Sequence, residues 1–130
     1  MTPSSEKWLH LNTYEKRYLK QVIKTYDKIM METQDIQQIA TEYKVSIEEV
    51  KRAKDYAFGT GVSQNQFSPD PNMAEAWLRL GSENGTQVDE VLLRHEIYES
   101  DLVLNKGYKQ ANAHKLAQKR YPWSDLSPNN

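Results

Sequence analysis

Two histidines and a glutamate in the last third of the chain are the residues best suited to chemistry. His95 and Glu99 are four residues apart in the run LLRHEIYE, and His114 follows in ANAHKLA. Side chains four apart on a helix project from the same face, so His95 and Glu99 can hydrogen-bond each other or share a ligand. An imidazole changes charge near neutral pH, and a carboxylate can orient it for proton transfer. The spacing therefore favours a polar site on one helix face.

The helix expected over residues 88–105 would carry the first two of these residues. Its apolar stripe is completed by His95 and Glu99 at positions where core residues belong, whereas Glu96 points elsewhere. A buried carboxylate is costly unless it is paired, so Glu99 should have a partner. The stripe itself consists of Val88, Val91, Leu92, Leu102 and Val103.

A second helix, expected over residues 108–121 and ended by Pro122, would supply that partner. At about 1.5 Å per residue, Glu99 lies roughly 9 Å from the intervening turn at Lys106-Gly107 and His114 lies roughly 10 Å from it. In an antiparallel hairpin the two positions face each other. We therefore expect His95, Glu99 and His114 to meet between the last two helices.

Three interpretations of this cluster are open at the level of sequence. The first is a buried hydrogen-bond network that locks helix packing. The second is acid–base cleavage of an RNA phosphodiester, in which His95 is the base, Glu99 orients it and His114 is the acid. The third is a two-histidine, one-carboxylate metal site, although HEIYE is not the zincin HExxH. In the second, basic side chains of the last helix would hold the phosphate: Lys115, Lys119 and Arg120.

The rest of the chain predicts an all-α fold, a single compact domain over residues 1–130 with about six helices. Asn12 with Glu15, and Ser46 with Glu49, have the spacing of capping boxes, and Asp70 precedes Pro71 at a helix start. The expected helices before the hairpin cover residues 13–31, two segments within 34–58, and 71–81. A loop is expected over 59–69, and flexible tails over 1–12 and 124–130.

The two helices within residues 34–58 have the spacing of a helix-turn-helix, IQQIATEYKVSIEEVKRAKDY. Lys51, Arg52 and Lys54 make the second helix basic, while Glu48 and Glu49 at its start would repel phosphates. The alternative function is therefore a non-enzymatic interaction protein that binds nucleic acid or another protein through this segment or the tyrosine-rich first helix.

Composition excludes several kinds of site. The 130 residues include no cysteine, which removes disulfides, cysteine nucleophiles and thiolate zinc sites. The net charge of −1 specifies no partner. No apolar run approaches the length of a membrane span or a signal peptide, so we expect a cytoplasmic site of action and no membrane partner. No cofactor is expected apart from the divalent metal of the third interpretation.

The segment from Phe67 to Trp123 resembles a small domain at the C-termini of bacterial polymorphic secreted toxins and of some prophage head-morphogenesis-like proteins. The resemblance rests on FSPD, AWLRL, LLRHEIYE and ANAHKLA, and extends upstream to IQQIATEYKVS. It implies an all-helical toxin effector, as an excised or free-standing domain, and carries no established activity with it. The partners that we expect are a cognate immunity protein and an RNA or DNA substrate. By this likeness His95, Glu96, Glu99 and His114 are motif positions. The chain departs from the pattern at Tyr56, where a histidine is expected, and this puts its activity in doubt.

Overall fold

Short helices make up the fold in a computed structural model that describes residues 6–127. No strand occurs within this range, so the predicted all-α class and single compact domain are confirmed. The elements are α2 (Thr13–Tyr18), α3 (Lys20–Met31), α4 (Gln34–Tyr43), α5 (Ile47–Phe58), α6 (Thr60–Gln64), α7 (Pro71–Gly81), α8 (Gln87–Ser100), the π-helix η1 (Asp101–Asn105), α9 (Gln110–Arg120) and α10 (Trp123–Leu126).

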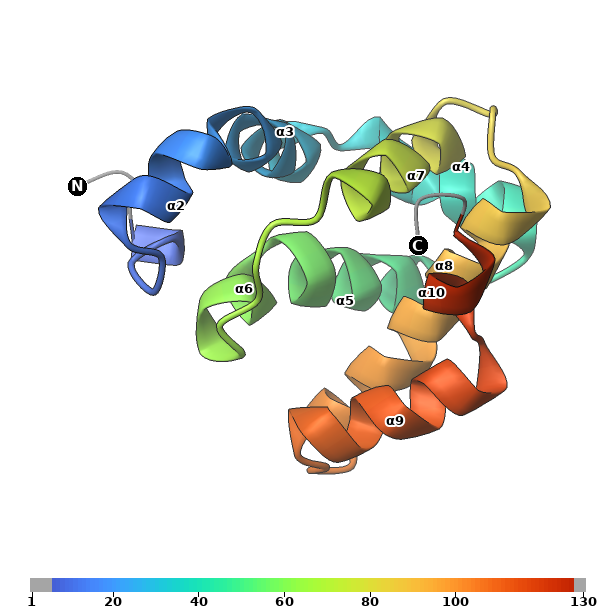
Figure 1. The fold of residues 1–130 in the computed structure, drawn as a ribbon. Helices are drawn as coiled ribbons and strands as arrows, with labels where there is room; N and C mark the ends of the chain where they lie inside the picture. The colour runs from blue at the N-terminus through green and yellow to red at the C-terminus, as the bar shows by residue number, and fades with distance from the viewer. Residues whose placement is uncertain (1–5, 128–130) are drawn as a thin grey trace.

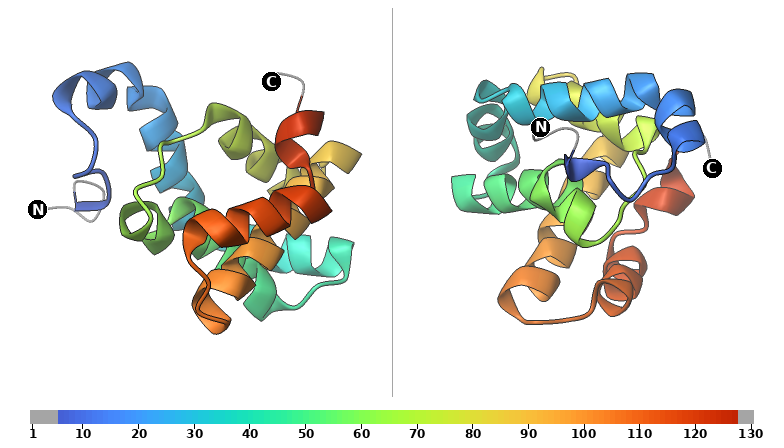
Figure 2. Two further views of the ribbon diagram at one scale, coloured as in Figure 1. Left: turned by 60° about the horizontal axis from the view of Figure 1, so that its bottom comes forward. Right: turned by 90° about the vertical axis from the view of Figure 1, so that its left-hand side faces the viewer.

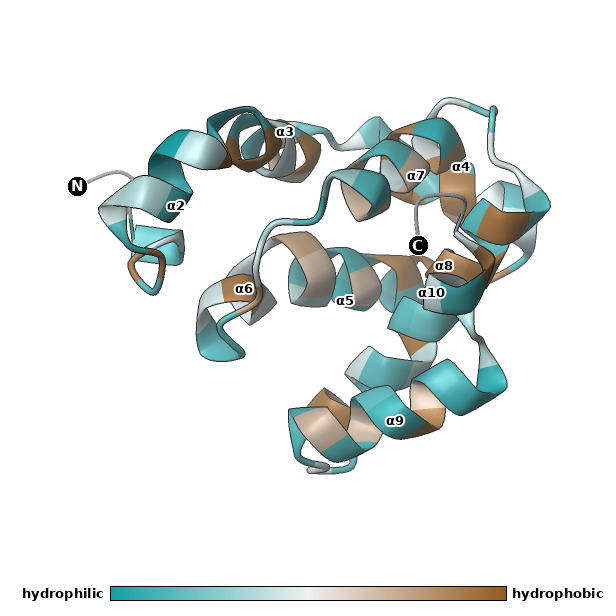
Figure 3. Cartoon of the chain, in the orientation of Figure 1, coloured by the Kyte–Doolittle hydropathy of each residue, from teal (hydrophilic) through white to brown (hydrophobic). Residues whose placement is uncertain are grey.

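Helix α5 lies at the centre of the fold and contacts α3, α4 and α8. Figure 1 shows α3 and α7 on one side of α5 and α9 on the other. Buried aromatic rings join the layers: Phe58 of α5 lies 4.8 Å from Tyr26 of α3 and 5.4 Å from Trp77 of α7, between ring centroids. Hydrophobic residues recur along α3, α4 and α5 in Figure 3, whereas α9 is largely hydrophilic. The main core is thus formed without α9.

The predicted helix starts are confirmed. Asn12 and Ser46 each form a complete capping box with the glutamate three residues later. Asp70 accepts hydrogen bonds from the backbone N–H groups of Asn72 and Met73, with Pro71 in the first turn of α7. These side chains satisfy backbone donors that a helix leaves unpaired, which explains why the helices begin where the sequence predicts.

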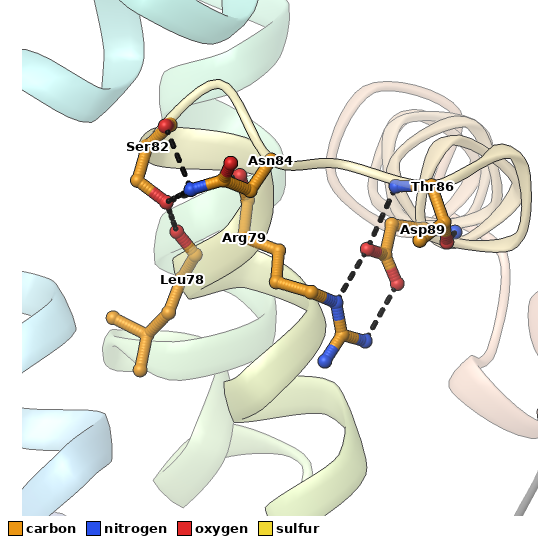
Figure 4. Close-up of polar contacts among 6 residues, drawn as sticks. All are labelled: Leu78, Arg79, Ser82, Asn84, Thr86 and Asp89. Atoms are coloured by element: carbon orange, nitrogen blue, oxygen red, sulfur yellow. Dashed lines mark hydrogen bonds and ion pairs between the residues drawn. The ribbon is translucent and has the colours of Figure 1, made fainter.

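A further capping box, absent from the prediction, starts α8. Thr86 accepts from the backbone N–H of Asp89, and Asp89 accepts in return from that of Thr86. Arg79 of α7 donates two hydrogen bonds to the same carboxylate, at 2.7 and 2.8 Å, so one buried aspartate ties α7 to the start of α8 (Figure 4). This attachment sets the direction in which α8 leaves α7.

Several predicted boundaries are wrong. The helix expected over residues 13–31 is interrupted at Leu19, whose backbone has a ψ of 17°. Tyr14 and Tyr18 stack on each other at the exposed surface of this segment, which tyrosine tolerates because its ring carries a polar hydroxyl. The loop expected over residues 59–69 contains α6, whose first residue, Thr60, donates from its backbone N–H and its hydroxyl to the side chain of Asp55.

The segments predicted to be flexible tails contain packed residues near both ends of the described chain. Trp8 and Leu11 are buried in the main core. At the other end, residues 123–126 form α10, and Ser127 is buried. The apolar side chains near both ends supply the burial that orders them. The remainder of the predicted tails, residues 1–5 and 128–130, lies outside the described residues.

Helices α8 and α9 form the predicted hairpin, as the right-hand view of Figure 2 shows. The first arm is α-helical to Ser100 and then widens into η1, where the backbone N–H of Lys106 donates to the carbonyl of Asp101. The second arm begins at Gln110, two residues later than predicted. Local π-helical turns often accompany functional sites, and this one adjoins the predicted cluster.

The helix-turn-helix spacing corresponds to α4 and α5, but two of the three basic residues assigned to the exposed face are engaged in the protein. Lys54 is buried and donates to the carboxylate of Asp35 and the carbonyl of Glu32. Arg52 donates to Ser100 and to the carbonyl of Ile97. Of the basic side chains of the second helix, Lys54 is therefore buried in an ion pair and Arg52 is engaged by α8. Within residues 6–127, no helix is long and apolar enough to cross a membrane.

Candidate functional site

Glu99 is the centre of the cluster, and its carboxylate receives four donors. Oε1 accepts from Nε2 of His95 at 3.0 Å and from Nδ1 of His114 at 2.9 Å. Oε2 accepts from the hydroxyl of Tyr56, and more distantly, at 3.4 Å, from the amide of Gln110. The predicted meeting of His95, Glu99 and His114 is confirmed. Because Glu99 is 3% exposed, these donors are what make its burial tolerable.

These donors favour the charged form of Glu99. Burial works to raise its pKa, but the hydrogen bonds from His95, Tyr56 and His114 hold the pKa below its usual value. The same arrangement raises the pKa of Tyr56, first through burial and then through the adjacent negative charge. At neutral pH, Tyr56 is therefore a neutral donor and Glu99 an ionised acceptor.

His95 faces an acceptor with each ring nitrogen. Nε2 lies against Glu99, and Nδ1 lies 3.0 Å from the backbone carbonyl oxygen of Tyr121. With Glu99 ionised, both contacts are satisfied when His95 is an imidazolium. Burial works to lower the pKa of His95, but the Glu99 hydrogen bond and the charge of Glu96 raise it overall. This protonation state leaves His95 no lone pair, so it does not match the base role expected from the sequence.

His114 is the accessible member of the cluster. Its side chain is 48% exposed, against 5% for His95, and the two rings are 5.2 Å apart between centroids. Nδ1 is oriented by Glu99, and Nε2 has no hydrogen-bond partner among residues 6–127. A carboxylate-oriented imidazole with one free nitrogen can take up or release a proton. His114 is therefore better placed than His95 for proton transfer.

The helical pattern predicted that Glu96 points away from the cluster, and this is wrong. Glu96 lines the same pocket as Glu99. The residue is 6% exposed, and no hydrogen bond to its carboxyl group occurs in the described part of the chain. Burial, followed by the negative charge of Glu99, raises the pKa of Glu96 to about 8. The protein thus holds two neighbouring carboxyl groups in different states, Glu99 ionised and Glu96 protonated, which is a common arrangement at functional sites.

The pocket beside this cluster encloses about 210 Å³. It lies between α3, α5, α7, α8 and α9, and its walls include aromatic and aliphatic side chains as well as carboxyl groups. Neither lysine nor arginine belongs to its lining. The lining residues are Tyr26, Ala57, Phe67, Ser68, Asp70, Met73, Glu96, Glu99, Gln110 and His114.

The three residues expected to hold a phosphate lie outside this pocket. Lys115 and Lys119 are exposed on α9. Arg120 is exposed as well, and its guanidinium lies 5.4 Å from the ring of Tyr98 and 5.7 Å from that of Tyr121, measured to the centroids. On a helix, residues one, five and six positions after His114 point away from its face. These three cations are therefore not part of the pocket beside His114.

Sequence reasoning missed the residues that support the cluster. Tyr56 was counted only as a departure from the family pattern, yet its hydroxyl binds Glu99. The Tyr121 contact is made by a backbone carbonyl and has no residue-type signal. Gln110, one helical turn before His114, could have been found from its spacing on the same face.

The cluster also meets the requirements of a metal site. The ligand atoms offered by His95, Glu99 and His114 all lie within 4.8 Å of one another. Two imidazoles and one carboxylate form the protein ligands of hydrolytic zinc centres, which leave a further position open. A metal-binding histidine usually donates its other N–H to a carbonyl or carboxylate, as His95 does to Tyr121. The donor set and its outer contacts therefore fit a divalent cation.

Comparisons with other proteins add no assignment: no protein family model, curated protein or solved structure matches this chain. The geometry of the cluster and its pocket is therefore the basis for a functional assignment.

Proposed function

We propose that this protein is a divalent-metal hydrolase whose ion is held by His95, Glu99 and His114. The observation that carries the proposal is the convergence of their ligand atoms within 4.8 Å at the edge of a pocket. Zinc fits this donor set best, because imidazole and carboxylate ligands with an open position are typical of zinc hydrolases.

The outer contacts support the ligand roles. The Tyr121 carbonyl fixes the ring of His95 and leaves Nε2 toward Glu99. Tyr56 and Gln110 hold Oε2 of Glu99, so Oε1 faces the two imidazoles. An ion bound here would replace the hydrogen bonds from both rings to Oε1, and His95 would release a proton.

The bound ion, Glu96 and His114 would then have different roles in hydrolysis. A bound zinc ion would polarise a substrate carbonyl or phosphoryl oxygen and lower the pKa of its water. Glu96, a buried carboxyl in the same pocket without a hydrogen-bond partner among residues 6–127, is suited to carry a proton to or from the reacting group. The half-exposed ring of His114 marks the side from which substrate would enter.

Metal analysis tests this proposal directly. Protein stripped with a chelator and reloaded with Zn²⁺ should retain a stoichiometric ion after desalting, as measured by mass spectrometry. His114→Ala and Glu99→Gln should lose the ion, whereas His10→Asn, which changes the histidine outside the cluster, should keep it. Circular dichroism would confirm that each variant is folded. A folded wild type that retains no stoichiometric ion would overturn the metal site.

One observation favours a second candidate, metal-free acid–base hydrolysis by His114. Its Nδ1 lies 2.9 Å from Glu99, and its Nε2 has no partner in the described range. Hydrolytic activity that survives chelation but is lost in His114→Ala would favour this mechanism over the metal-dependent one.

The resemblance to toxin domains supports a cellular role for either hydrolase. We propose a bacterial or prophage effector that is restrained by an immunity protein and acts inside the target cell. Growth inhibition on expression in bacteria is the corresponding test.

A further inference from the structure

We propose that the pocket beside the cluster binds the cationic side chain of an arginine or lysine, which makes a basic peptide the substrate class of the hydrolase. This inference rests on the proposed function. It also changes the expectation from sequence, which was RNA or DNA.

Charge is the first argument. Asp70, Glu96 and Glu99 belong to the lining of the pocket, while lysine and arginine are absent from it. The cations once assigned to a phosphate are exposed on α9 and outside this lining. A phosphodiester in this pocket would meet the ionised carboxylate of Glu99 and no lysine or arginine side chain, whereas a guanidinium or ammonium group would find carboxyl oxygens that can accept its hydrogen bonds.

The two carboxyl groups have acceptor capacity to spare. Oδ1 of Asp70 caps α7 by accepting from the backbone N–H groups of Asn72 and Met73. Its Oδ2 has no hydrogen-bond partner within residues 6–127. Glu96 is more than nine-tenths buried, and its carboxyl group has no partner in that range either. Glu96 is thus a deeply buried side chain in the pocket lining whose carboxyl group is free to accept a hydrogen bond from a ligand.

The walls match the remainder of a basic side chain. Tyr26, Phe67 and Met73 provide apolar surface between the carboxyl groups. Arginine and lysine bury an aliphatic stem along such surface, and aromatic faces attract their charged ends. The volume of about 210 Å³ is small for a drug-sized ligand, which usually occupies roughly 300–1,000 Å³, but suits a single side chain.

Binding can be measured without metal or turnover. The probe is N-acetyl-arginine amide, and its control is N-acetyl-citrulline amide, which has nearly the same shape and no charge. Protein with ¹³C-methyl methionine is stripped of metal and titrated by NMR. The Met73 methyl in the pocket should shift on addition of the arginine probe, while that of Met31, which is 83% exposed on α3, should not.

Substitution then tests the carboxyl groups. Asp70→Asn keeps a good helix cap and should weaken binding of the arginine probe by about tenfold or more, as expected for loss of one charge-assisted hydrogen bond. Glu48→Gln, at an exposed position on α5, should bind like the wild type. Equal binding of the citrulline probe would overturn the proposal.

Inorganic phosphate and a short RNA are the competing probes. Saturable shifts of Met73 with either one, without shifts from the arginine probe, would overturn the proposal and restore the nucleic-acid expectation. Since all titrations use metal-free protein, their result can be interpreted even if the protein binds no metal. Arginine binding in a chain that retains no zinc would refute the metal site and support the pocket assignment.

Discussion

The backbone carbonyl of Tyr121 accepts a hydrogen bond from Nδ1 of His95 at 3.0 Å, although the two residues are 26 positions apart. Tyr121 follows the last residue of α9, and Pro122 prevents the helix from continuing. The hairpin is therefore joined near this end by His95 and near its turn by the His114–Glu99 contact. The same imidazole that offers a ligand atom also anchors α9 to α8.

Removing that anchor should destabilise the metal-free protein. His95→Ala leaves the Tyr121 carbonyl and one donor position on buried Glu99 unsatisfied, so we expect a loss of about 2–4 kcal/mol in the free energy of unfolding. Urea titration followed by circular dichroism measures this loss. His114→Ala is the matched control and should cost about 1 kcal/mol or less, because its ring is half exposed to water. Equal losses in the two variants would contradict the anchoring role of His95.

Tyr56 should tune metal affinity through its contact with Glu99. Tyr56→Phe removes the hydroxyl donor to Glu99 and keeps the ring that packs 5.4 Å from Phe67. Loss of such an outer contact typically weakens metal binding by about 10–100-fold, so we expect a decrease in that range. Competition with a zinc indicator gives the affinity. Tyr18→Phe, at an exposed position on α2, is the control and should leave it unchanged.

The cluster could be predicted from sequence because its signals are local and periodic. His95 and Glu99 occupy core positions of one helix, and Lys106-Gly107 fixes the distance to His114 along the next. The helix starts were predictable for the same reason, since a capping side chain lies within three residues of its acceptor.

The remaining features depend on tertiary contacts that residue spacing does not encode. Glu96 enters the pocket because α3 and α7 close over it from distant parts of the chain. From sequence alone, Lys54 would be taken for an exposed cation, but in the structure it forms an ion pair with Asp35 of α4. Trp8 and Leu11 had no periodic neighbours, and only the assembled core shows that their segment is packed.

Asp89 should make stability depend on pH in acid. Burial works to raise the pKa of Asp89, but the hydrogen bonds from Arg79 and Thr86 lower it below the usual 3.8. A carboxyl group whose pKa is lowered in the folded state stabilises the protein at pH values above its pKa in the unfolded state. This contribution is lost as the pH falls through the pKa of the folded state.

We therefore expect Asp89→Asn to lower the free energy of unfolding by about 1–3 kcal/mol at pH 7. The difference in stability between the variant and the wild type should shrink steadily below pH 3.8. Thermal unfolding of both proteins across this range checks it. A difference that is constant with pH would mean that the ion pair drawn in Figure 4 contributes nothing.

Expression in bacteria should separate an effector from an interaction protein. Wild-type protein, induced from a tightly repressed promoter, should arrest growth if the cluster attacks a cellular target. His114→Ala and Glu96→Gln should each relieve the arrest, because the first removes a proposed ligand and the second removes the proposed proton carrier while preserving its shape. His10→Asn should remain as toxic as the wild type, and comparable protein levels on a blot would exclude differences in expression.

Gels of total RNA, DNA and protein from arrested cells then identify the target. Degraded nucleic acid would contradict a basic-peptide substrate, whereas intact nucleic acid with altered proteins would support it. Since the proposed chemistry requires both Glu96 and His114, toxicity that persists in both variants would assign the growth arrest to another surface of the protein.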